Sequence, residues 1–507
     1  MPRLTRLSTC SVLALTVASG PAFADLTAEE VWNGMESLMQ GVGYTVSATE
    51  TPTSGGLTVT GITMGIAMPE DNAAFTMSID EISFVENGDG SVSVAFPASM
   101  PIAINAAPEG EDDVSMVIDY ANTGLDLVVS GDGDNMQYTY SAERLSVSLA
   151  ELVVDGETIG REAARFDAVM TDLNGTASTS DGSSTQIAQD LTIGGVTYDM
   201  AFTDPETNDS AMISGSMDAA KITSASTLPE EFDASDPASL TDDFAIEGTL
   251  SFTNGQTEFA ATESSGTSSG ATQSGAVNLS FAMDNTTVRY DVTATDQSLS
   301  ISGAELPVPI NVSMARSGLK VEAPVAASES PEDMAFGLTF GGFEMSDLLW
   351  NMFDPGAALP RDPATIALDL TGKVTPFVNL LDPASMAQLD ATGGAPGELN
   401  ALTLEDLTVE VAGAKLGGTG AFTFDNSDLQ TFGGFPRPNG EVILSLNGAN
   451  GLIDKLIAMG LLTSEDAMGA RMMMSMFAVP GDGPDNLTST IRINEQGHIL
   501  ANGMRIQ

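Results

Sequence analysis

The feature that most constrains this fold is an alternation of apolar and polar side chains with a period of two, which returns along most of the chain. Residues 57–60 (LTVT) and 91–96 (SVSVAF) alternate in this way, and residues 87–90 (NGDG) precede the second run. Alternation gives a strand one apolar face, and an Asn-Gly turn joins antiparallel neighbours. Because such runs recur about every ten residues between Gly, Asp and Asn turns, the sequence predicts a mainly β fold. We expect a long antiparallel meander in an elongated or curved sheet.

A few segments depart from this period and predict helices. Residues 25–42 place apolar side chains at helical spacing, and Thr27 with Glu30 forms a capping box at the start. Further helices are predicted near 346–353, 451–459 and 464–477. The expected fold therefore has an N-terminal helix and a C-terminal helical pair beside its sheet.

Two polar segments predict breaks in the meander. Residues 222–242 are acidic and contain prolines, which favours a linker or a long crossing loop, and residues 262–275 (TESSGTSSGATQSG) predict a mobile loop between strands. The expected organisation is an N-terminal helix plus β-meander over 25–221 and a β-rich half over 243–507. These observations are compatible with one continuous sheet and with two domains.

The first 24 residues predict where the protein works. Arg3 and Arg6 precede a short apolar run over 10–20, and residues 22–24 (AFA) match a cleavage site. This pattern is typical of a secretory signal peptide cleaved after Ala24, so we expect a periplasmic protein. No later segment reaches the roughly 18 continuous apolar residues of a membrane span, so no transmembrane segment is expected after cleavage.

Charge and cysteine content exclude several classes of partner and site. The chain has 70 acidic against 17 basic residues, a net charge of −53, which repels nucleic-acid phosphates. This charge fits a saline habitat or, alternatively, cation binding. Cys10 is the single cysteine and lies in the predicted signal peptide, so we expect no disulfide and no thiolate site.

The residues that could carry catalysis are few. His498 is the single histidine, and no HExxH, GxSxG or P-loop pattern occurs. Asp132 and Asp134 favour a β-turn over a calcium site, because the other ligands of an EF-hand are missing. We therefore predict no catalytic residue, no metal ligand and no cofactor. The alternatives are an exported hydrolase with a carboxylate-based site and a calcium- or salt-stabilised surface protein.

Methionine is the unusual apolar choice of this chain, with 26 residues, many of them inside strand runs. Methionine fills irregular gaps in cores and also lines adaptable binding surfaces. The second possibility predicts a groove for acyl chains, which Met472, Met473 and Met476 would cap. Trp350 favours packing in a helix. Arg361 is expected either to pair with a neighbouring carboxylate, that of Asp354 or Asp362, or to bind a ligand.

Several motifs in the C-terminal half resemble those of a known family. They are residues 349–355 (LWNMFDP), 359–363 (LPRDP), 452–462 (LIDKLIAMGLL), 468–473 (MGARMM) and 494–498 (NEQGH). The chain resembles the bacterial family catalogued as domain of unknown function 2125, over nearly all of its length after the signal peptide. That family has no assigned activity, so the resemblance implies no catalytic residues. In style alone, the chain also resembles the AsmA-like group of β-rich envelope proteins, which is linked to lipid handling.

These observations together predict a non-enzymatic cell-envelope protein with a binding or structural role. Its expected partner is a lipid or another apolar ligand held in a groove of the sheet. The residues proposed to bind that ligand are Trp350, Arg361, Met472, Met473 and Met476.

Overall fold

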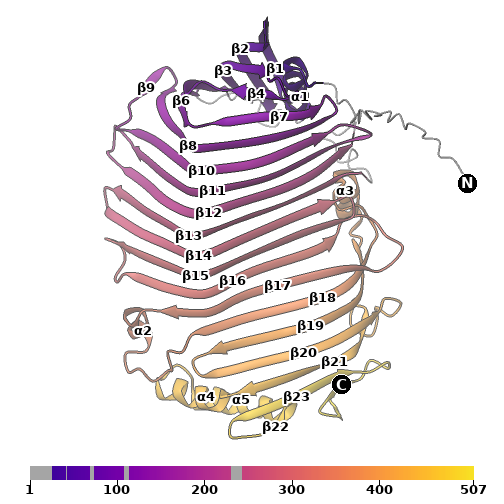
Figure 1. The fold of residues 1–507 in the computed structure, drawn as a ribbon. Coiled ribbons are helices and arrows are strands. Elements are labelled where there is room, and N and C mark those ends of the chain that lie inside the picture. Colours follow the sequence, from indigo (N-terminus) through magenta and orange to yellow (C-terminus); the bar gives the residue numbers. More distant parts are fainter. Residues whose placement is uncertain (1–24, 42, 69–72, 108–113, 230–242) are drawn as a thin grey trace, which may run out of the picture.

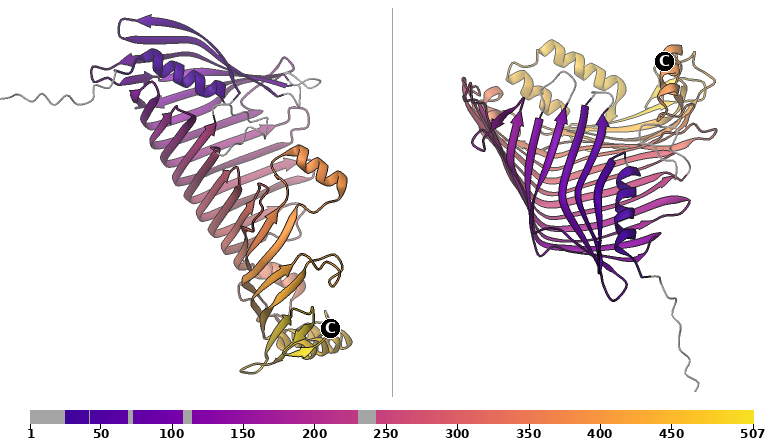
Figure 2. Two further views of the ribbon diagram at one scale, coloured as in Figure 1. Left: turned by 90° about the vertical axis from the view of Figure 1, so that its right-hand side faces the viewer. Right: turned by 90° about the horizontal axis from the view of Figure 1, so that it is seen from above.

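The computed structural model describes residues 25–507 apart from 42, 69–72, 108–113 and 230–242, so the predicted signal peptide lies outside the described residues. The predicted fold class is confirmed, because one antiparallel sheet makes up most of the molecule. Consecutive strands stack side by side from β1 to β23 (Figure 1), and the sheet curves into a trough (Figure 2).

The sheet begins with shorter strands at its N-terminal end. There, β4 and β5 together occupy one position beside β3, and β6 and β7 together occupy the next position beside β8. The bounds are β1 (Thr45–Thr53), β2 (Gly56–Met68), β3 (Ala73–Glu86), β4 (Val92–Ala95), β5 (Ser99–Ala107), β6 (Val114–Thr123), β7 (Asp126–Asp132), β8 (Asn135–Val154) and β9 (Glu157–Ile159).

The middle of the sheet consists of long strands in simple chain order, each paired with the one before and the one after. The bounds are β10 (Ala164–Ser180), β11 (Ser184–Thr203), β12 (Ser210–Pro229), β13 (Ala245–Glu263), β14 (Gly266–Asp284), β15 (Thr287–Gly303), β16 (Ile310–Pro324), β17 (Glu332–Met345), β18 (Ala364–Pro376) and β19 (Gly397–Val411).

The C-terminal end closes with shorter strands and two helices. The strands are β20 (Ala414–Asp425), β21 (Arg437–Asn447), β22 (Val479–Pro480), β23 (Asn486–Ile493), β24 (Ile499–Ala501) and β25 (Met504–Arg505). The helices are α1 (Ala28–Gly41), α2 (Asp347–Phe353), α3 (Pro383–Thr392), α4 (Ala449–Ala458) and α5 (Ser464–Phe477), which confirms the N-terminal helix and the C-terminal pair.

A line of unusual backbone conformations crosses the long strands near their middles. Asp172, Ala219, Asn254 and Asp296 have φ values of 53°, 48°, 52° and 48°, in the left-handed region. Register places small residues opposite them, and the whole line consists of Asp172, Gly194, Ala219, Asn254, Gly275, Asp296, Ala315 and Gly342. We call it the bend line, because a left-handed residue turns the path of a strand.

The bend line needs small residues because there is no room for larger side chains at these positions. A Cβ atom on Gly194 would lie 2.9 Å from the Cβ atom of Asp172, and a Cβ atom on Gly275 would lie 2.8 Å from Oδ2 of Asp296. Two full side chains cannot meet at this crease, so left-handed residues are mostly opposed by Gly or Ala. Each of these strands therefore contains its own residue that produces or accommodates the bend of the trough.

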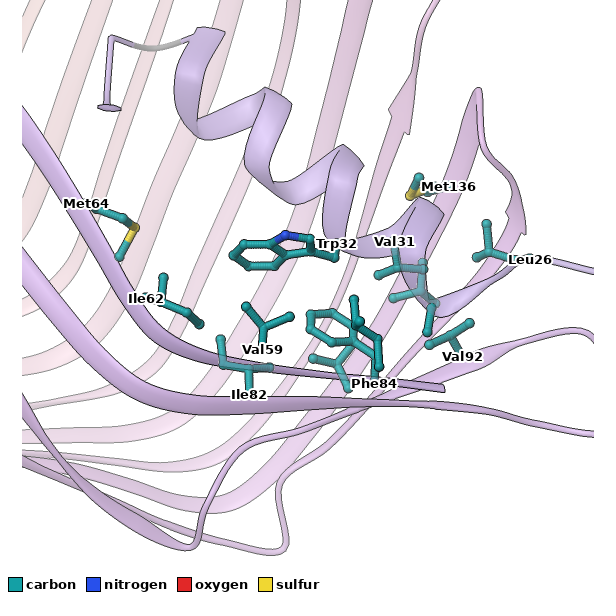
Figure 3. Close-up of a cluster of buried hydrophobic side chains, with 14 residues drawn as sticks. Leu26, Val31, Trp32, Val59, Ile62, Met64, Ile82, Phe84, Val92 and Met136 are labelled. Atoms are coloured by element: carbon teal, nitrogen blue, oxygen red, sulfur yellow. The ribbon is translucent and has the colours of Figure 1, made fainter. Parts of the chain in front are cut away.

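The tightest core lies where α1 packs on the sheet at the N-terminal end (Figure 3). Val31 and Trp32 of α1 are 0% and 1% exposed, and the Trp32 ring meets Phe84 edge-on at 6.1 Å between centroids. The predicted capping box is present, because Oγ1 of Thr27 accepts from Glu30 N and the Glu30 carboxylate accepts from Thr27 N.

Three local predictions were wrong. Residues 262–275 are not a loop, since they belong largely to β13 and β14, which pair with each other over their whole length. The first eight residues of the predicted linker, 222–229, lie in β12, and residues 230–242 lie outside the described part. The sequence also predicts a turn at 494–497 followed by one last strand over 498–506, but the structure has a tight hairpin of β24 and β25 there.

β12 pairs directly with β13, so of the two arrangements left open by the sequence the structure has the continuous sheet. Within the described ranges, no helix has both the length and the apolar character needed to cross a bilayer.

Candidate functional site

One face of the sheet carries mostly apolar side chains, which Gln189, Ser224 and Gly248 interrupt on β11 to β13. We call the face on which α1 packs the inner face, and the opposite one the outer face. Directly paired residues of neighbouring strands point to the same face. Starting from Val92 and Val129 under α1, the pairing leads along one continuous row: Tyr138, Ala177, Gln189, Ser224, Gly248, Phe281, Tyr290, Val321, Phe336, Leu370, Leu404, Gly420, Val442 and Ile491.

The neighbouring row on the outer face is polar. It includes Glu247, Arg289, Glu322, Glu441 and Arg492, and Arg289 Nε donates to Oε1 of Glu322 at 3.2 Å. Other ion pairs of the long strands also lie on this face, such as Lys221–Asp190 at 3.0 Å and Lys373–Asp333 at 2.7 Å. The trough is therefore apolar inside and charged outside.

The inner face holds a pocket of about 540 Å³ at the bend of β11 to β17, which we call the bend pocket. Residues on both sides of the bend contribute to the lining of this pocket. The inner face is therefore the concave face of the trough. The lining residues are Tyr198, Ser216, Met217, Phe252, Gly255, Gln256, Thr257, Thr272, Gln273, Ser274, Val277, Gln297, Ser298, Leu299, Val312, Ser313, Met314 and Phe343. None of them is acidic or basic.

The inner face is covered at its two ends and open between them. Near the middle, Phe202 is 54% exposed and Phe340 is 43% exposed, although both belong to the apolar rows. At the C-terminal end, α5 lies over β20, β21 and β23 and encloses a second apolar pocket of about 620 Å³, the C-terminal pocket. Its lining includes Leu416, Leu444, Leu487, Ile491, Met474 and Phe477.

The predicted methionine cluster lies mostly at the surface. Met472, Met473 and Met476 are 61%, 63% and 55% exposed, and Met473 also borders the C-terminal pocket. That these methionines cap a groove for acyl chains stays a prediction. The strand methionine Met314 lines the bend pocket, so the methionine signal in the sequence pointed to inner-face positions as well.

Trp350 and Arg361 come together at a separate corner on the edge of the sheet, beside α2. The guanidinium carbon of Arg361 lies 5.9 Å from the Trp350 ring centroid, its Nη2 donates to Oδ1 of Asn351 at 2.7 Å, and its Nη1 pairs with Asp347. The predicted pairing of Arg361 with Asp354 or Asp362 was therefore wrong. Figure 1 places α2 and α5 apart, so the five predicted site residues form two groups.

Asp354 instead organises the loop that follows α2. Its buried carboxylate accepts hydrogen bonds from the backbone N–H groups of Leu359 and Ala358, both at 2.9 Å. These two bonds hold the pKa of Asp354 below its usual value, with a smaller contribution from Arg361. The corner has the hydrogen bonding of a structural turn.

Acidic side chains elsewhere also serve turns. Asp132 accepts from the backbone N–H groups of Asp134 and Asn135, which confirms the predicted turn, and the Asn135 side chain lowers its pKa. The pKa of Asp382 is lowered by the Ser385 hydroxyl in the same way. Every carboxyl group with a resolved shift in the described ranges has its pKa lowered. No cluster of three metal-ligating side chains occurs there.

Sequence reasoning missed the bend pocket. Its lining residues come from seven strands, and their spacing along the chain carries no motif. The one available signal was the loss of alternation at each bend.

Comparison with known proteins gives a family but no activity. A family model described as an uncharacterised protein conserved in bacteria (DUF2125) matches residues 224–506. The match includes the C-terminal motifs that suggested this family, and it begins within β12, so α1 and the first strands lie outside it. No curated protein and no solved structure matches the chain.

Proposed function

We propose that this chain, which belongs to the DUF2125 family of uncharacterised bacterial proteins, is a non-enzymatic protein of the cell envelope. In this proposal it holds a lipid or another apolar ligand against the inner face of its sheet. The signal-peptide pattern of residues 1–24 is the reason for placing it in the periplasm.

The observation that carries this proposal is the set of large apolar side chains that stay exposed in the middle of the inner face. Isolated exposed apolar residues are normal, but a contiguous apolar surface marks a site of interaction. Helices could cover the middle of the trough in the way that α1 covers its N-terminal end. Phe202, Phe340 and Ile366 nevertheless stay exposed there. A long apolar ligand would cover them as α1 covers Val59.

The concave shape favours a ligand over a flat partner. The bend pocket and the C-terminal pocket have volumes of about 540 and 620 Å³, in the range of small-molecule sites. Both lie on the same face. An acyl chain that follows the trough would contact side chains of many strands without a charged group in its path through the bend pocket.

The proposal is tested by purifying the protein from the envelope of its own cells and analysing the bound material by native mass spectrometry and lipid extraction. We expect co-purified amphiphile. Leu299→Glu adds a carboxylate inside the bend pocket and should lower the bound amount several-fold. Ser300→Glu is the matched control, because it adds the same charge one residue further on β15, at an exposed position. Bare protein from every preparation would contradict the proposal.

The location is tested separately. Cell fractionation should recover the protein with periplasmic markers, and N-terminal sequencing should begin at Asp25. Recovery in the cytosol with the N-terminal segment retained would remove the envelope part of the proposal.

A further inference from the structure

The C-terminal pocket differs from the core under α1, although a helix covers the inner face of the sheet in both places. Under α1, Val59, Val92 and Val129 are fully buried. Under α5, the aliphatic side chains of the sheet are only partly buried, and they belong to Leu416, Leu444, Leu446, Leu487 and Ile491. Helix α5 therefore leaves a space of about 620 Å³ above its strands, where α1 packs densely.

Hydrogen bonds hold α5 in this position. At its C-terminal end, the Phe477 carbonyl oxygen accepts from the Ser489 hydroxyl at 2.6 Å and from Nδ2 of Asn502 at 2.9 Å. Further back on the helix, Nη2 of Arg471 donates to Oδ1 of Asp454 on α4 at 2.6 Å. Because these bonds fix α5 at two points, the space between helix and sheet is a built part of the fold.

The lining of this pocket is almost entirely apolar. Among the described residues that line it none is charged, and only Thr488 and Ser489 are polar. The Ser489 hydroxyl is already bonded to Phe477, and Thr488 precedes it on β23, so the Thr488 side chain points to the other face. A polar headgroup would lose its hydration here without replacement, whereas an alkyl chain gains from each methylene that leaves water.

The pocket is also open to solvent along α5. Ala470, Met473 and Phe477 belong to its lining and are exposed at the same time. An alkyl chain can therefore enter beside the helix while the group at its end stays in water. The flexible side chain of Met473 can adapt to such a chain.

We infer that the C-terminal pocket binds the alkyl tail of an amphiphile and makes no contact that selects its headgroup. This inference rests on the proposed function and states which part of the ligand the protein recognises, namely the length of an alkyl chain.

The test uses the purified protein and three probes below micelle formation: decyl maltoside, dodecyl maltoside and dodecylphosphocholine. Isothermal titration calorimetry gives the three affinities. We expect dodecyl maltoside to bind roughly tenfold more tightly than decyl maltoside, because two further methylenes leave water. Dodecylphosphocholine has the same tail and a different headgroup, so it should bind with nearly the affinity of dodecyl maltoside.

A substitution at the opening tests the pocket itself. Ala470→Phe places a ring there and should weaken dodecyl maltoside binding about fourfold for each methylene that the ring displaces. Ser475→Phe is the matched control, because it adds the same ring to α5 at an exposed position outside the pocket. Thermal unfolding of both variants checks that the fold is kept.

Hydrogen exchange locates the probe without any substitution. Dodecyl maltoside should slow exchange in α5 and β23. Protection of β14 to β16 instead would place the tail in the bend pocket, which would overturn the inference and leave the proposed function intact. Affinities that follow the headgroup and not the chain length would do the same. If no probe binds, the inference fails, and if protein from its own envelope is also bare, the proposed function fails with it.

Discussion

The N-terminal end and the middle of the inner face bury their apolar side chains to different extents. Under α1, the residues Val59, Val92 and Val129 are fully buried, and Trp32 fills the space between helix and sheet. On β11, a few strands further on, Phe202 of the same face is half exposed. The difference teaches that cover by a helix is not what holds the middle strands together. Their long antiparallel ladders, the outer-face pairs and contacts along the bend line do so, which leaves the inner face free for a ligand.

Truncating the largest side chain of each region gives the strongest test of this comparison. Trp32→Ala should destabilise the N-terminal end by about 3–5 kcal/mol, because it leaves a cavity in a dense core. Phe202→Ala should cost about 1 kcal/mol, since much of its ring already contacts solvent. Hydrogen exchange checks both, because strands of a meander unfold locally.

Asn33→Ala is the control for the helix, as Asn33 is exposed on α1 beside Trp32. We expect faster exchange in β1 to β4 for Trp32→Ala alone. Equal losses for Trp32→Ala and Phe202→Ala would break the comparison, because they would show that the middle of the trough has a core of the same kind.

The bend line gives a second test, in the long strands that no helix of the N-terminal end covers. Ala219→Gly should stabilise the protein by up to about 1 kcal/mol, because glycine adopts a φ of 48° without the penalty that a Cβ atom imposes. Ala220→Gly, one residue away in a buried strand position, should destabilise it by about 1 kcal/mol. Urea unfolding measures both. A loss of stability in both variants would show that the bend does not depend on the left-handed residue.

The bend line also explains how much of the fold the sequence could predict. The fold class, the helices and the turn at Asp132 follow from local patterns, and the structure confirms them. The long strands were predicted as halves, because alternation fails at the bend. Leu173 and Met170 both belong to the inner-face cluster although they are three residues apart, and the same holds for Ile193 and Val196. A period of two therefore ends at each left-handed residue.

Composition misled the prediction in a different way. The Ser/Gly-rich residues 262–275 have low strand propensity, yet β13 and β15 flank them and supply partners for their backbone groups. Likewise, Gln297 and Phe343 meet in the bend pocket only because β15, β16 and β17 are neighbours in register. The spacing of these residues along the chain does not predict that they line the same pocket.

A smaller, pH-dependent effect is expected at the corner beside α2. Asp354→Asn should lower the melting temperature at pH 7, because an amide cannot accept both hydrogen bonds from Leu359 and Ala358 as a carboxylate does. The folded pKa lies below the unfolded value of about 3.9, so this stabilisation is complete above that pH and is lost as the pH falls through the folded pKa. Melting curves from pH 7 to pH 2.5 should therefore converge at the acid end. Curves that stay equally far apart at all pH values would assign the effect to packing.

The smallest effect on stability is expected on the outer face, where we expect no single ion pair to contribute much to the free energy of unfolding. Lys221 and Asp190 lie 3.0 Å apart, and each side chain is about half exposed. Exposed pairs of this kind contribute less than about 1 kcal/mol, and salt screens them. Lys221→Ala should therefore lower stability slightly in 20 mM salt and not at all in 500 mM salt, as measured by urea unfolding. A loss of several kcal/mol at both salt concentrations would mean that charged outer-face contacts, and not the backbone ladder, support the uncovered middle of the sheet.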